Sequence, residues 1–99
     1  MRELRDLPRL AALLALTVLL LASCKPRPLP DADSPAAQLY KSRCGACHAA
    51  YNPRGMTAAM WQVQVDMMEG KMRDAGMAPL TEGERQMILD YLTRNAGAG

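Results

Sequence analysis

The sequence predicts an all-helical fold, and two observations lead to this prediction. Apolar side chains recur at intervals of three and four residues, and these segments lie between recognisable helix-capping signals. No stretch alternates between apolar and polar residues as a half-buried strand would, and no internal repeat is present. We therefore expect a small domain of about three helices.

The first of these helices is expected to begin at Pro35. Ser34 is a good N-cap residue, and proline is favoured at the first helical position, where its missing N–H costs no hydrogen bond. The helix carries Leu39 and Tyr40 before a cysteine-rich segment. A loop should follow at residues 51–55, where Asn, Pro and Gly occur together.

Two further helices should complete the domain. The second is expected to start after the N-cap Thr57 and to continue to about Arg73, with Gly76 suited to its C-terminal end. The third opens with a capping box at residues 81–84. Its apolar face should consist of Ile88, Tyr91 and Leu92.

The N-terminus has the pattern of an export signal. Arginines 2, 5 and 9 precede an apolar run of twelve residues, 10–21. This length fits a signal-peptide core and falls short of the ~20 residues needed to span a bilayer. We expect residues 1–23 to be a signal peptide that takes no part in the domain.

A cysteine follows this run directly. The sequence Leu21-Ala22-Ser23-Cys24 is similar to a bacterial lipobox, in which Cys24 receives the lipid and becomes the first mature residue. Several acyl chains on one residue would anchor the chain stably. An ordinary secretory signal with a chance cysteine, or an uncleaved anchor, is the alternative. Residues 24–34 are rich in proline and predict an extended tether that leaves the domain, residues 35–99, free to turn.

The most specific feature is the sequence Cys44-Gly45-Ala46-Cys47-His48, because C-x-x-C-H is the attachment signature of c-type haem. Cys44 and Cys47 would form thioethers to the haem, and His48 would be the proximal iron ligand. A zinc site is disfavoured because there is no second cysteine pair and no other histidine. A thioredoxin-like dithiol is disfavoured because no βαβ pattern surrounds the motif. The prediction is one covalent haem c.

With this motif, the domain resembles a small bacterial class I cytochrome c. That resemblance implies that the helix before the motif crosses the last helix, with Tyr40 and Tyr91 at the crossing. It also implies that a methionine binds the iron on the distal side. The chain departs from the family in its short segment after His48 and in having no phenylalanine. It is more similar to a short, often exported subgroup with a Trp-led middle helix, here at Trp61.

The resemblance leaves the distal methionine open. The family's usual spacing before Tyr91 favours Met72, and the subgroup's spacing after Trp61 favours Met68 as second choice. Met77 is disfavoured because little loop separates it from the last helix. Most of the methionines should simply pack in the core. The part after residue 23 contains Met56, Met60, Met67, Met68, Met72, Met77 and Met87.

Two residues are expected to support the haem. The carbonyl of Pro53 is placed to accept the Nδ1–H of His48 and so fix its tautomer, with plain turn chemistry as the alternative. Resemblance to some class I members implies that the indole N–H of Trp61 binds a haem propionate. The alternative is a core tryptophan whose N–H meets another acceptor.

Composition excludes several other functions. Nine basic and eight acidic residues follow residue 23, with no basic run that would suggest nucleic-acid binding. No catalytic triad, carboxylate pair or phosphate loop is present. We therefore expect a monomeric, non-enzymatic electron carrier, lipid-anchored and facing the periplasm, that serves periplasmic or membrane redox proteins. The alternatives are a haem subunit of a membrane dehydrogenase or reductase, and an open-site haem sensor or peroxidase.

Overall fold

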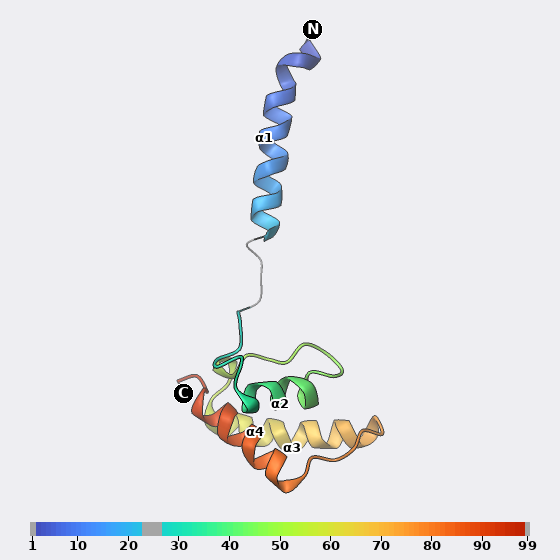
Figure 1. Ribbon diagram of the computed structural model, residues 1–99, viewed down its shortest axis with the longest axis vertical. Coiled ribbons are helices and arrows are strands. Elements are labelled where there is room, and N and C mark those ends of the chain that lie inside the picture. Colours follow the sequence, from blue (N-terminus) through green and yellow to red (C-terminus); the bar gives the residue numbers. More distant parts are fainter. Residues whose placement is uncertain (1, 23–26, 99) are drawn as a thin grey trace.

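The computed structural model describes residues 2–22 and 27–98, and within these ranges it contains helices and loops but no strand (Figure 1). The all-helical fold class is therefore confirmed. In order along the chain, the elements are α1 (Arg2–Ala22), α2 (Pro35–Cys44), the 3-10 turn η1 (Pro53–Gly55), α3 (Ala58–Asp74) and α4 (Glu82–Arg94).

The helix starts are set by local side-chain caps, as the sequence predicted. The hydroxyl of Ser34 accepts a hydrogen bond from the Ala37 amide at 3.1 Å, and Pro35 occupies the first turn of α2. Thr57 caps α3 in the same way. At α4, Thr81 and Glu84 exchange side-chain to backbone bonds of 3.0 and 3.1 Å, which completes the capping box.

The core forms where α2 and α3 both pack against α4. Three aromatic rings meet at its centre. Tyr40 lies 5.8 Å from Tyr91 and 6.2 Å from Trp61, measured between ring centroids. The aromatic crossing of the first and last domain helices is therefore confirmed. The fully buried apolar side chains of this core are Ala37, Tyr40, Trp61, Val65, Ile88, Tyr91 and Leu92.

None of the described side chains of helix α1 takes part in this core. Its described large apolar side chains are exposed, and Figure 1 shows it apart from the three-helix unit. No helix among the described residues is both long enough and apolar enough to cross a membrane. Cys24, the predicted lipid-bearing residue, lies outside the described residues. The signal peptide and the lipid anchor therefore stay predictions.

The segment we expected to be a free tether is, in its described second half, docked on the domain. We call residues 28–34 the strap. The carbonyl of Pro30 accepts a hydrogen bond from the Tyr91 hydroxyl at 2.8 Å. The carbonyl of Pro28 accepts one from the side-chain amide of Asn52 at 3.2 Å. Leu29 packs against the core. The proline count predicted an extended chain, but residues 30–33 form a turn in which the Ser34 amide donates to the Asp31 carbonyl at 2.8 Å. Nor could the count show that the carbonyls of Pro28 and Pro30 find donors on the domain surface.

Candidate haem-binding site

The C-x-x-C-H motif forms the turn that follows α2. Cys44 is the last residue of that helix and is half-buried, whereas Cys47 is exposed, and both are free thiols. Gly45 caps the helix with its N–H on the Lys41 carbonyl at 3.0 Å. A Cβ on Gly45 would lie 2.4 Å from that same carbonyl oxygen, so this position needs glycine.

The environment of Cys44 places it against α3. Burial raises the pKa of its thiol to about 11, the neighbouring Arg43 guanidinium lowers it, and the Glu69 carboxylate raises it. The thiol is therefore protonated at neutral pH. Because Glu69 is on α3, the charge that raises this pKa comes from the C-terminal half of that helix.

The imidazole of His48 is exposed on the turn. Its Nδ1 lies 2.9 Å from the carbonyl oxygen of the adjacent Ala49, and its ring centroid lies 5.0 Å from that of Tyr51. If Nδ1 carries the proton, it donates to this carbonyl and Nε2 keeps the lone pair that binds a metal. We expected the carbonyl of Pro53 in this role. The structure gives Ala49 instead, because the chain turns immediately after His48.

The two supporting residues are partners of one another. The indole N–H of Trp61 donates to the carbonyl of Pro53 at 2.7 Å in a buried setting. Trp61 is thus a core tryptophan whose N–H finds a backbone acceptor, which was the alternative to a haem propionate. The Pro53 carbonyl accepts from this indole rather than from His48. This bond fixes the loop after the motif to the core of α3.

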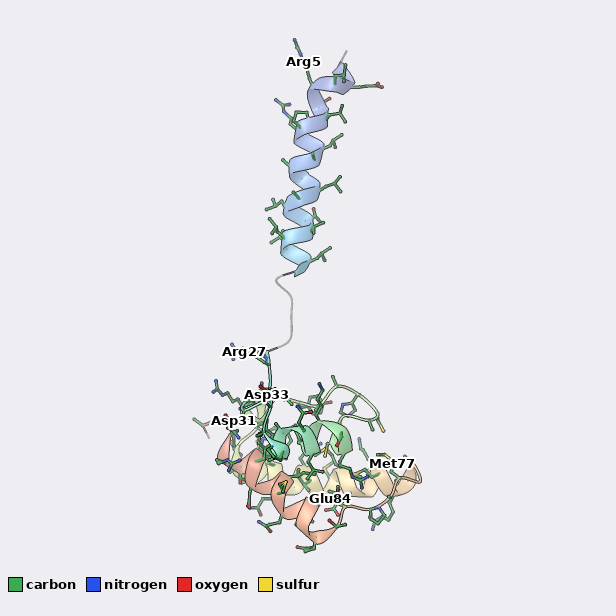
Figure 2. The ribbon with its side chains drawn as sticks, in the orientation of Figure 1. Arg5, Arg27, Asp31, Asp33, Met77 and Glu84 are labelled. Atoms are coloured by element: carbon green, nitrogen blue, oxygen red, sulfur yellow. The ribbon has the colours of Figure 1, made fainter. Side chains whose placement is uncertain are left out.

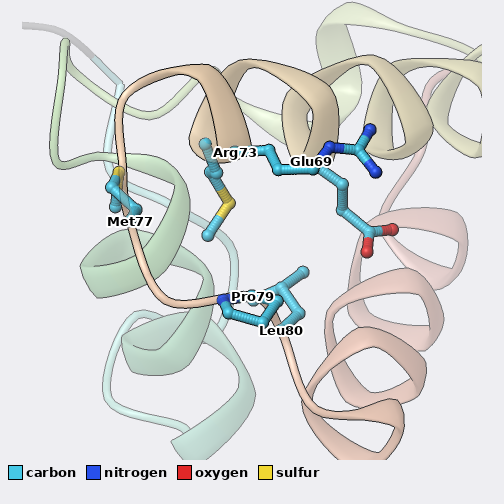
Figure 3. A pocket seen from close by; sticks show the side chains of 6 residues that line it. Glu69, Arg73, Met77, Pro79 and Leu80 are labelled. Atoms are coloured by element: carbon cyan, nitrogen blue, oxygen red, sulfur yellow. The ribbon is translucent and has the colours of Figure 1, made fainter.

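A pocket of about 180 Å³ lies at the C-terminal end of α3 (Figure 3). Met72 is buried there, with 7% of its surface exposed, and Met77 is half-buried. Met68 instead packs against the core cluster. The structure therefore groups Met72 with Met77, which we had disfavoured. The pocket is lined by Glu69, Met72, Arg73, Met77, Pro79 and Leu80.

The end of α3 explains why these two methionines meet. The amide of Met77 donates to the Met72 carbonyl at 2.9 Å, and that of Gly76 to the Arg73 carbonyl at 3.0 Å. With Gly76 at a φ of 72°, this is a Schellman motif. In that motif the residue after the glycine, here Met77, lies beside the residue three positions before the C-cap Ala75, here Met72. We expected Gly76 to end the helix, and its left-handed conformation also brings Met77 beside Met72.

The pocket adjoins the attachment turn. Arg43, the residue before Cys44, donates through Nη2 to the carbonyl of Ala78, the residue after Met77, at 2.5 Å. Two free thiols, an imidazole with an available nitrogen and two thioethers therefore lie on adjoining segments. These are the donor types that c-type haem requires. In the described part of the chain, no group of three or more His, Cys, Asp or Glu side chains is arranged to hold a metal ion. The residues present fit a covalent haem.

Comparison with known proteins identifies the family. A family model described as dihaem cytochrome c matches residues 40–99, which include the motif, α3 and α4. The chain belongs to this cytochrome family. No curated protein and no solved structure matches the chain.

Membership makes this chain a haem-binding cytochrome of the electron-transfer class. The family description names two haems, whereas this cytochrome has one C-x-x-C-H sequence and a single histidine. The distal position is where sequence reasoning about the cytochrome was least complete. It missed the partnership of Met72 with Met77 and the contact of Arg43 with the loop behind them.

Proposed function

We propose that this cytochrome carries one haem c and acts as a one-electron carrier. Cys44 and Cys47 would hold the haem as thioethers, and His48 would bind the iron on the proximal side. A single observation carries the proposal: the only C-x-x-C-H sequence of the chain adjoins a pocket that holds two thioethers. When bound, the haem supplies the Fe(II)/Fe(III) couple.

The distal ligand is proposed to come from the pocket. Met72 and Met77 share it, and Met68 is turned towards the core. His48 and one of these methionines would together hold the iron, and this pairing raises the reduction potential relative to ligation by two histidines. An iron held by two protein side chains would suit electron transfer rather than substrate binding.

Anchoring is a further part of the proposal. A lipid on Cys24 would hold the domain at the periplasmic side of a membrane. The exposed attachment turn at Cys47 and His48 offers a small surface, and weak electron-transfer contacts are of this size class. Periplasmic or membrane redox proteins are the partners that such a surface would serve.

The central experiment expresses the full chain in a host with a haem-attachment system. We expect one haem per chain by pyridine haemochrome assay, and a mass increase that survives denaturation. The double variant Cys44→Ala/Cys47→Ala should lose this covalent haem.

Cys24→Ser is the matched control, because it removes the third cysteine. It should keep the haem and lose the mass of the lipid, measured on the intact protein. Two haems per chain, or haem retained by the double variant, would contradict the proposed attachment. A lipid mass that persists in Cys24→Ser would contradict only the anchor.

A further inference from the structure

The side chain of Arg43 joins two segments that are far apart in the sequence. It leaves the last turn of α2 and reaches the loop between α3 and α4, where Nη2 donates to the Ala78 carbonyl at 2.5 Å. Its Nε lies 3.8 Å from Oε2 of Glu84, at the start of α4. The side chains of Arg43 and Glu84 are only 22% and 31% exposed, so solvent screens this contact less than it would a surface pair.

One end of this bridge is next to a proposed haem-attachment cysteine, and the other is next to a proposed iron ligand. Arg43 directly precedes Cys44, and Ala78 directly follows Met77. A shift at either end would therefore pass to the attachment turn or to the thioether through one peptide unit. Figure 2 shows Met77 on the loop after α3 and Glu84 near the start of α4.

The partner of Arg43 is itself held in place. Glu84 accepts from the amide of Thr81 in the capping box, at 3.0 Å. That hydrogen bond, followed by the nearby Arg43 charge, lowers the pKa of the Glu84 carboxyl, although burial opposes the shift. Glu84 is therefore ionised at neutral pH and presents a fixed negative charge to the guanidinium.

The loop has few other attachments between its ends. The Schellman motif holds Met77 and the capping box holds Thr81. Among the described residues, the bond from Arg43 is the one hydrogen bond that joins the intervening residues 78–80 to another element. Hydrogen bonds from a charged donor are stronger than neutral ones. Removing this bond would leave the middle of the loop held by packing alone.

We propose that Arg43 is a positioning residue that keeps the pocket methionines at the distance from the attachment turn at which a thioether reaches the iron. This inference rests on the proposed function, because it presumes haem on Cys44 and Cys47. It assigns to Arg43 no contact with the haem itself.

The test measures ligation in the oxidised, haem-loaded full chain. In Arg43→Gln we expect the methionine-to-iron charge-transfer band to weaken. Added imidazole, which competes for the distal position, should bind about tenfold more tightly, because the lost charged hydrogen bond no longer favours the bound thioether. Arg43→Lys, which keeps one charged donor, should recover part of both changes.

Asp66→Asn is the matched control. Asp66 on α3 pairs with Arg85 on α4 and does not line the pocket, so its loss also removes a charge and an inter-helix ion pair. It should lower stability while leaving the band and imidazole affinity near wild type. Should Arg43→Gln accumulate poorly, Glu84→Gln removes the counter-charge alone and should shift imidazole affinity in the same direction.

Two outcomes separate the possible failures. If both Arg43→Gln and Glu84→Gln keep the charge-transfer band and the imidazole affinity of the wild type, the role of Arg43 is overturned and the proposed function stays intact. Absence of covalent haem or of the methionine band in the wild-type protein would overturn the proposed function, and the role of Arg43 with it.

Discussion

Trp61 shows how one side chain can connect the attachment loop to the core. Its ring is fully buried and packs edge-on against Tyr40. Its N–H meets the carbonyl of Pro53, five residues after His48, at 2.7 Å. The Met56 amide also donates to this carbonyl, but at 3.5 Å, so the indole supplies the shorter of its two hydrogen bonds in a buried setting. The indole therefore stabilises the loop that carries the chain away from the proximal ligand.

We expect Trp61→Phe to lower the free energy of unfolding of the haem-loaded protein by about 1–3 kcal/mol, because the buried Pro53 carbonyl loses its short bond to the indole and keeps only the 3.5 Å bond from the Met56 amide. Denaturant unfolding followed by circular dichroism measures this. An unchanged free energy together with a shifted reduction potential would instead assign the indole to a haem propionate.

At the scale of elements, the turn between α3 and α4 decides where the two pocket methionines lie. Gly76 takes a φ of 72°, a conformation in which a side chain costs energy, and nothing crowds its Cβ position. The constraint at this position is therefore the backbone angle and not space. The Schellman motif that depends on it holds Met77 beside Met72.

Gly76→Ala should therefore destabilise the protein by about 1–2 kcal/mol, the cost of a left-handed conformation for a residue with a Cβ. Thermal unfolding gives the stability, and the methionine-to-iron band reports the position of Met77. Gly83→Ala is a useful comparison, since Gly83 lies within α4 and nothing crowds its Cβ position. It should be neutral or stabilising, because alanine is the better helix former. Equal effects of the two variants would contradict the role of the left-handed turn.

The strap is the second element whose position depends on distant contacts. Tyr91 on α4 donates to Pro30, and the Gln38 side chain on α2 donates to the Ala32 carbonyl at 2.6 Å. The strap thus runs over the junction of the two crossing helices. If the chain is anchored at Cys24, docking leaves few residues between the lipid and the domain.

Tyr91→Phe keeps the ring against Tyr40 and removes the bond to the strap. We expect a loss of about 0.5–1.5 kcal/mol in stability. Amide hydrogen exchange should become faster at residues 31–34 than in the wild type. Exchange rates unchanged in this segment would show that the packing of Leu29 and the bonds from Asn52 and Gln38 hold the strap without the Tyr91 hydroxyl.

At the scale of the whole molecule, stability rests on one small core. Seven fully buried apolar side chains from three helices form it, and domains of this size commonly need an additional staple. A covalent haem between the attachment turn and the pocket would join α2 to the end of α3. That position is also where Arg43 already links the two.

The core also predicts how stability responds to alkaline pH. Burial, as the largest cause, raises the pKa of Tyr40 far above its usual value near 10. The folded protein therefore keeps this proton at a pH where the unfolded chain has lost it, so stability should fall as pH rises above about 10. Tyr91 is shifted in the same direction, again mainly by burial.

In Tyr40→Phe the free energy of unfolding should fall less steeply above pH 10 than in the wild type. At pH 7 the variant should be about 0.5–1.5 kcal/mol less stable, because the hydrogen bond from the Tyr40 hydroxyl to the Tyr51 carbonyl is lost. Chemical denaturation of the haem-loaded protein at a series of pH values measures both. Tyr51→Phe, at an exposed side chain, should retain the wild-type slope. A wild-type slope in Tyr40→Phe would contradict the role of its burial.

Local features were open to sequence reasoning because they depend on residues a few positions apart. Ser34, Thr57 and the capping box at Thr81 mark the starts of the three domain helices, and each cap acts within one turn. The attachment motif is equally local, and its residue order alone indicates its chemistry.

Only the tertiary structure decided which distant groups meet. It gave the Pro53 carbonyl to Trp61, placed Met77 with Met72, joined Arg43 to Ala78 and docked the strap on Tyr91. Each of these depends on how α2, α3 and α4 pack, and spacing along the chain does not contain that information. The sequence by itself therefore determined that this protein has helices and a haem-attachment turn, whereas packing determined what faces that turn.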